Sequence, residues 1–238
     1  MVRRCRTKLL LRVADSGDPQ PSAESVAMNR RQAMTGGLAA LAVGSPRVVQ
    51  AATEQLGANT WRSYIEQPHL VIQNCPQWCW AASASMIFAH HGYAVAQERI
   101  VSRVFGGMPC VPSSAGPWGA SGTISAVLGI PWQDDSGRGQ FRPTIVAGYD
   151  HFQRVNQISN AFIVEEVANN RPLLYCNTHH AMVIVSVVYQ RSAYGVSVQE
   201  VGVLDPWPTS GGYRPLNRME MTSRELGGHM TYLAAVHI

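Results

Sequence analysis

The 238-residue sequence contains no apolar run of the roughly 18 residues that a membrane-spanning helix requires. It has no stripe of Lys and Arg interleaved with aromatic residues, which a nucleic-acid surface would show. Internal repeats and the paired cysteine spacings typical of zinc sites are also absent, and the net charge of +4 is modest. We therefore expect no membrane, nucleic acid or metal as a partner, and no cofactor.

Apolar residues make up 46% of the sequence, enough for one sizeable core or for two half-domains that share a cleft. Helical periodicity dominates from about residue 61 to residue 128, and runs rich in Val and Tyr, which are typical of strands, follow from residue 173. The expected fold class is α+β, with an N-terminal helical lobe packed against a C-terminal antiparallel sheet. We predict helices at 79–91, 97–105, 121–128 and 160–169, and strands at 173–176, 180–189, 195–204 and 232–238.

The N-terminal residues are interpreted as segments that precede the folded domain. Residues 1–27 are polar and interrupted by Pro and Gly, which indicates disorder or a start codon assigned too early. Residues 28–52 combine Arg30-Arg31 with a weakly apolar core and small residues at its end, a pattern similar to a twin-arginine export signal. We expect residues 53–238 to form the domain of a secreted or periplasmic bacterial protein, and the alternative is a cytosolic protein with a short amphipathic helix here. N-terminal sequencing of secreted material tests this.

The stretch 73–83 places Cys, Trp and Pro directly before an Ala-rich segment. Apolar residues then recur at helical spacing up to Gly92, which is a helix stop signal, so we predict a helix that begins near Cys79. Orphan backbone N–H groups and the helix dipole favour an anion in the first turn of a helix. Cys79 is therefore a candidate thiolate nucleophile. The alternative interpretation is a buried structural cysteine between two Trp residues.

A thiol nucleophile needs a base, and the base needs an orienting group. His180 directly precedes an apolar run, and Asp205 ends another run just before Pro206. Two adjacent antiparallel strands bring such residues side by side. Asp205 would then fix the imidazole tautomer and favour its charged form.

Three further residues complete the set of candidates. The side-chain amide of Gln73 and the backbone N–H of Cys79 would together form an oxyanion hole. His179 is the alternative base, because neighbouring strand residues point to opposite faces and only one can face the thiol. Asp150 is the alternative to Asp205 as orienting carboxylate.

The order of these motifs resembles that of the papain-like cysteine peptidases. The sequence has a Gln, then Cys-Trp six residues later at a helix start, then His-Ala before an apolar strand, then Asp at a strand end. It is similar in particular to the short bacterial branches, the bacteriocin-leader peptidases and the plant-pathogen effector peptidases. The resemblance covers about residue 61 to the C-terminus. It implies an oxyanion-hole Gln, a nucleophile, a base and an orienting residue, which here are Gln73, Cys79, His180 and Asp205.

The resemblance has departures and one further implication. Residues 76–78 are Pro-Gln-Trp, where papain has small residues before its nucleophile, and Asp replaces the usual orienting Asn. Papain carries a disulfide near its active site, which implies a Cys75–Cys110 bridge in an oxidising compartment. Cys176 is then expected to be a buried strand thiol.

The expected activity is hydrolysis of peptide bonds in protein or peptide substrates by a monomeric enzyme. The thiol attacks the carbonyl, the imidazole protonates the leaving amine, and water hydrolyses the thioester. One alternative is an amidase or acyltransferase that acts on cell-wall peptides, which product analysis would distinguish. The other is an inactive binding module on the same scaffold.

Overall fold

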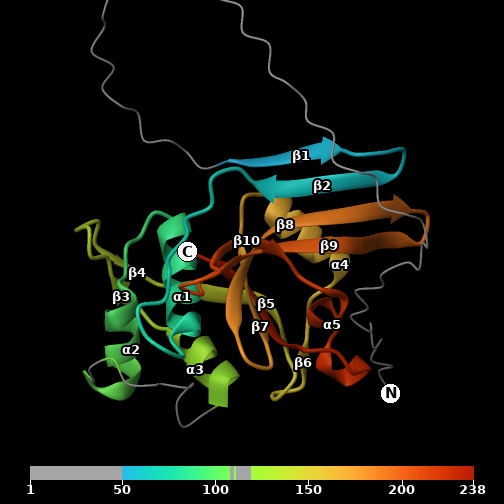
Figure 1. Ribbon diagram of the computed structural model, residues 1–238. Coiled ribbons are helices and arrows are strands. Elements are labelled where there is room, and N and C mark those ends of the chain that lie inside the picture. The colour runs from blue at the N-terminus through green and yellow to red at the C-terminus, as the bar shows by residue number, and fades with distance from the viewer. Residues whose placement is uncertain (1–49, 108–109, 111–118) are drawn as a thin grey trace, which may run out of the picture. The chain divides into compact units, whose positions relative to one another are not determined.

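The computed structural model describes residues 50–107, 110 and 119–238, which all belong to one compact unit. The predictions for residues 1–27 and for nearly all of 28–52 lie outside the described residues. In the described part, helices combine with a large antiparallel sheet (Figure 1). This mixed architecture agrees with the α+β expectation and is compatible with a papain-like fold.

The four predicted helices are present, with ends that differ by at most two residues. Their limits follow local signals: α2 ends at Gly106, whose φ of 78° is left-handed, and α4 begins after Ser159, whose side chain accepts from the N–H of Phe162. No helix of the described residues is long and apolar enough to cross a membrane. The helices are α1 (Cys79–His90), α2 (Gln97–Phe105), α3 (Gly119–Val127), α4 (Asn160–Ala168), the unpredicted α5 (Arg218–Met221) and the 3-10 helix η1 (Arg224–Leu226).

The described strands form one nine-stranded sheet and one hairpin. The sheet has the order β1-β2-β8-β7-β11-β5-β6, with β9 paired to β8 and β10 paired to β9, and its ladders are antiparallel. The strands are β1 (Ala51–Gln55), β2 (Thr60–Ile65), β5 (Thr144–Asp150), β6 (Val155–Asn156), β7 (Leu173–Asn177), β8 (Ala181–Ser192), β9 (Gly195–Asp205), β10 (Gly212–Pro215) and β11 (Met230–His237), with β3 (Trp132–Gln133) and β4 (Gln140–Phe141) in the hairpin.

The sheet extends further than the sequence predicts. β7, β8, β9 and β11 confirm the four predicted strands, whereas β1, β2, β5 and β10 were not predicted. The helical assignment from residue 61 is wrong for β2, which pairs along its length with β8, for example Trp61 with Tyr189. β1 begins at Ala51, so the last two residues of the predicted export signal pair with β2. The first part of the domain therefore contributes strands to the sheet as well as helices.

Two cores lie on opposite faces of this sheet, because alternate strand residues point to opposite sides. On one face the helices α1, α2 and α3 pack against residues such as Leu174 and Val183. On the other face α4 packs against residues such as Tyr175 and Met182. α1 is buried from Trp80 to Phe88, so the thiol at its start is held by a helix inside the core.

Cys75 and Cys110 form a disulfide with their Cα atoms 5.6 Å apart, which confirms the predicted bridge. It joins the loop before α1 to the segment that follows α2. Cys176 is a free buried thiol, also as predicted, and Cys79 is free and half-buried. The loop that presents Cys79 is therefore covalently tied to a second segment four residues before the thiol.

Candidate active site

Cys79 is the first residue of α1, as predicted, and Trp78 is its N-cap. The preceding Gln77 has a φ of 63°, a left-handed conformation that costs an L-residue about 1–2 kcal/mol. The loop is closed by the N–H of Trp78, which donates to the carbonyl of Cys75 at 3.3 Å. This turn directs the chain into the helix, so that Cys79 lies at the N-terminus of α1, beside its first backbone N–H groups and the positive end of its dipole.

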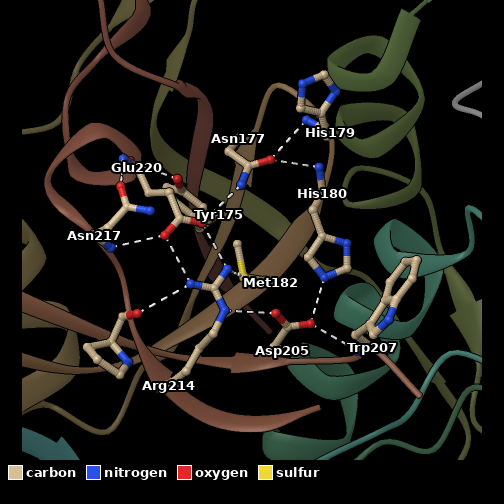
Figure 2. Close-up of polar contacts among 11 residues, drawn as sticks. Tyr175, Asn177, His179, His180, Met182, Asp205, Trp207, Arg214, Asn217 and Glu220 are labelled. Atoms are coloured by element: carbon tan, nitrogen blue, oxygen red, sulfur yellow. Dashed lines mark hydrogen bonds and ion pairs between the residues drawn. The ribbon is translucent and has the colours of Figure 1, made fainter. Parts of the chain in front are cut away.

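His180 lies at the end of a tight turn between β7 and β8. The N–H of Asn177 donates to the carbonyl of His180 at 2.9 Å, and Asn177 Oδ1 accepts from the N–H groups of His179 and His180 at 2.9 and 2.8 Å (Figure 2). These bonds fix the backbone of the candidate base. Asn177 is not among the residues predicted for the site, and its only sequence signal is an Asn in a short turn between two strands.

The side chain of His180 lies between the candidate nucleophile and the candidate carboxylate. Its Nε2 is 2.7 Å from Asp205 Oδ1, and it also hydrogen-bonds the thiol of Cys79, which leaves Nδ1 as the atom for that bond. Burial lowers the pKa of His180, but the hydrogen bonds to Asp205 and Cys79 outweigh it and raise the pKa to about 9. His179 is exposed instead, so the structure brings His180, not His179, to Asp205.

Asp205 is buried at the end of β9 and hydrogen-bonded at both oxygens. Besides His180, its Oδ1 accepts from the N–H of Trp207 at 2.9 Å, and its Oδ2 accepts from Arg214 Nε at 2.9 Å (Figure 2). Burial raises the pKa of Asp205, but the bonds from His180 and Arg214 outweigh it and lower the pKa to about 2. The carboxylate therefore stays ionised beside the imidazole.

Two further residues, Trp207 and Gln73, lie close to the chain segment that begins at Asp205. The ring of Trp207 meets the His180 ring edge to face, with centroids 5.7 Å apart, and covers one side of the imidazole. The N–H of Gln73 donates to the carbonyl of Pro206 at 2.8 Å, which anchors Gln73 beside this segment. Its buried side-chain amide donates to the carbonyl of Cys75 at 3.0 Å.

A cavity of about 370 Å³ opens beside the thiol. Cys176 lies in the wall of this cavity. Its burial, and to a smaller extent the nearby charges of Cys79 and Asp150, raise the pKa of the Cys176 thiol well above its usual range. Cys176 is therefore a protonated apolar surface and not a second nucleophile. The lining consists of Gln77, Cys79, Trp80, Ile124, Cys176, Asn177, Thr178, His179, His180 and Ala181.

Asp150, the alternative carboxylate, binds backbone N–H groups of the turn that follows it. It is buried, and its Oδ1 accepts from the N–H groups of Phe152 and Gln153 at 2.9 and 3.0 Å. The structure does not bring it to His180. Across the residues that the structure describes, no group of three or more His, Cys, Asp or Glu residues is arranged to hold a metal ion.

A model of the Peptidase_C39 like family matches residues 62–226. The match begins within β2 and ends with η1, so it includes all the site residues described above, from Gln73 to Arg214. No curated protein matches the sequence.

Proposed function

The chain belongs to the Peptidase_C39 like family, and we propose that it is a cysteine peptidase that hydrolyses peptide bonds through an acyl-enzyme on Cys79. The family supports a cysteine peptidase activity of the papain-like clan. The observation that carries the finer proposal is the position of His180, which hydrogen-bonds both Cys79 and Asp205. A nucleophile, a base and an orienting group in this order are the parts that thiol acyl transfer requires.

In the first half of the reaction, the Cys79 thiolate attacks the substrate carbonyl carbon and a C–S bond forms. The proton on His180 Nδ1 then passes to the leaving amine as the C–N bond breaks, and a thioester remains. Asp205 stays ionised throughout and stabilises the imidazolium through Nε2. In the second half, His180 takes a proton from water, the resulting hydroxide attacks the thioester, and the C–S bond breaks. The carboxylic acid product loses its proton to solvent, and the Cys79 thiolate and protonated His180 are restored.

We assign the oxyanion hole to the backbone N–H of Cys79 and the side-chain amide of Gln73. Nε2 of Gln73 carries two hydrogens, and the bond to the Cys75 carbonyl uses one of them. Gln73→Glu keeps the shape of the side chain but removes both N–H donors. We expect it to lower kcat by about 10²–10³-fold, which is typical for the loss of one oxyanion donor. Steady-state kinetics checks this, and a change in KM alone would contradict the assignment.

The pH dependence of peptide hydrolysis tests the proposed function directly. The general acid is protonated His180, whose pKa is raised to about 9, so kcat/KM should fall only as the pH rises through about 9. An epoxide-type inhibitor of thiol peptidases should block casein hydrolysis and leave one adduct on Cys79 in peptide mapping. A rate that already falls near pH 6.5, the ordinary value for His, or an unlabelled Cys79 would contradict the proposal.

Export remains part of the proposal. The Cys75–Cys110 disulfide supports an oxidising compartment, because such bonds persist in secreted and periplasmic proteins. The twin-arginine-like pattern at 28–52 supports the same location, with protein or peptide substrates and a monomeric enzyme.

A further inference from the structure

We propose that Arg214 and Glu220 are positioning residues for this reaction: Glu220 fixes the Arg214 guanidinium, and Arg214 holds the Asp205 carboxylate in the orientation that His180 requires. The inference rests on the proposed function. Neither residue lines the cavity beside Cys79, so both act through Asp205 and not on the substrate.

The two oxygens of Asp205 are divided between partners on opposite sides (Figure 2). Oδ1 accepts from His180 Nε2 at 2.7 Å, whereas Oδ2 accepts from Arg214 Nε at 2.9 Å. The terminal torsion of an Asp side chain is broad, so a carboxylate held at one oxygen alone can rotate. Because Arg214 engages the second oxygen, the plane of the carboxylate is fixed with Oδ1 toward the imidazole.

Glu220 gives Arg214 a fixed position in turn. Arg214 Nη2 donates to Glu220 Oε1 at 2.8 Å and Nη1 donates to Oε2 at 3.0 Å, the two-pronged geometry in which Arg binds a carboxylate most specifically. Glu220 is itself held by a capping box: its Oε2 accepts from the N–H of Asn217, and its own N–H donates to Asn217 Oδ1, both at 3.0 Å. The guanidinium therefore has little freedom to move away from Asp205.

The network closes on His180 from a second direction. Asn177 Nδ2 donates to Glu220 Oε1 at 3.2 Å, and Asn177 Oδ1 accepts from the backbone N–H of His180 at 2.8 Å. Hydrogen bonds thus run from the imidazole through Asp205, Arg214, Glu220 and Asn177 back to the His180 backbone (Figure 2). One network sets both the backbone and the side chain of the base.

Charge supports the same role. Arg214 lies between two buried carboxylates, and the hydrogen bonds to Glu220 and then to Asp205 raise the pKa of Arg214 above its ordinary value. The guanidinium is therefore always charged and keeps Asp205 anionic. A buried ion pair by itself is weak grounds for a stabilising role. What indicates a role in the reaction is the position of this pair, because its carboxylate, Asp205, hydrogen-bonds the base His180 directly.

A matched control exists elsewhere in the fold. Arg171 Nη2 binds the buried carboxylate of Glu166 at 2.6 Å, and His237 Nε2 lies 2.9 Å from the other oxygen. The exposed fractions of the two Arg side chains are 30% for Arg171 and 32% for Arg214. This second Arg–carboxylate–His cluster does not line the cavity beside Cys79, so it separates loss of an ion pair from loss of positioning.

The experiment compares Arg214→Lys with Arg171→Lys in the full chain. Lysine keeps the charge, but one ammonium cannot reproduce the fork that bridges two carboxylates. For Arg214→Lys we expect kcat to fall about tenfold with KM within about twofold of wild type. NMR titration of the imidazole Cε1–H should show the pKa of His180, about 9 in the wild type, lowered by about one unit. Arg171→Lys should lower the melting temperature without either effect.

Glu220→Gln is the second variant, because Glu220 acts on Asp205 through Arg214 and on the His180 backbone through Asn177. It should move the His180 titration in the same direction by a smaller amount. If both variants titrate and turn over like the wild type while their melting temperatures fall as in Arg171→Lys, the network is structural only and the proposal is wrong. If the wild type cleaves no peptide, the proposed function fails instead, and the His180 titrations still decide the role of Arg214.

Discussion

Replacing Cys79 with alanine is expected to abolish peptide hydrolysis, with kcat lower by about 10⁴-fold or more, because no other thiol in the described part of the chain is placed to form the acyl-enzyme. Cys176 cannot substitute, since it is buried and its thiol stays protonated. Alanine is the best helix former, and Cys79 is half-buried at the first position of α1, so the free energy of unfolding should change by less than about 1 kcal/mol. Active-site titration, peptide hydrolysis and urea unfolding of both proteins measure these effects.

Cys79→Ser is the control for shape at the same position. The hydroxyl keeps the size of the side chain and a hydrogen bond to His180, but it is far harder to ionise than a thiol. We expect it to be nearly as inactive as the alanine variant and equally well folded. Activity above a few per cent of the wild-type rate in either variant would remove Cys79 from the mechanism.

Local signals explain why α1 to α4 were predictable and several strands were not. The limits of α1 and α2 follow from apolar periodicity and from a glycine after each last turn, Gly92 and Gly106, both with positive φ. β2 is defined instead by its partner β8, which begins more than a hundred residues later in the chain. β1 and β10 pair with the strands next to them in the chain, β2 and β9, but these short polar segments carry no alternating apolar pattern that would predict a strand.

The candidate site divides in the same way. His180 directly precedes β8 and Asp205 ends β9, and their meeting follows from the antiparallel pairing of these two predictable strands. Arg214 and Glu220 carry no such signal, because a lone Arg after a run of turn residues is usually a solvated side chain. Arg214 returns to Asp205 only because β10 folds back on β9. The groups that perform the proposed reaction are therefore more visible in the sequence than those that position them.

Replacing His180 with alanine is the second change for which we expect nearly complete loss, with kcat lower by about 10⁴-fold. The variant has neither the proton for the leaving amine nor the base for the attacking water. Asp205 keeps its bonds from Arg214 and Trp207, so it remains an ionised, partnered carboxylate and the fold should persist. Any residual hydrolysis should also lose the alkaline limb near pH 9, since that limb belongs to His180.

His237→Ala is the matched control, because it also removes an imidazole that lies 2.9 Å from a buried carboxylate, that of Glu166. We expect it to lower the melting temperature while kcat and the alkaline limb stay as in the wild type. The comparison therefore separates the loss of a His–carboxylate pair from the loss of the proton carrier. Substantial hydrolysis by His180→Ala with an unchanged pH profile would show that another group carries the proton, because a positioning role alone cannot set the alkaline limb.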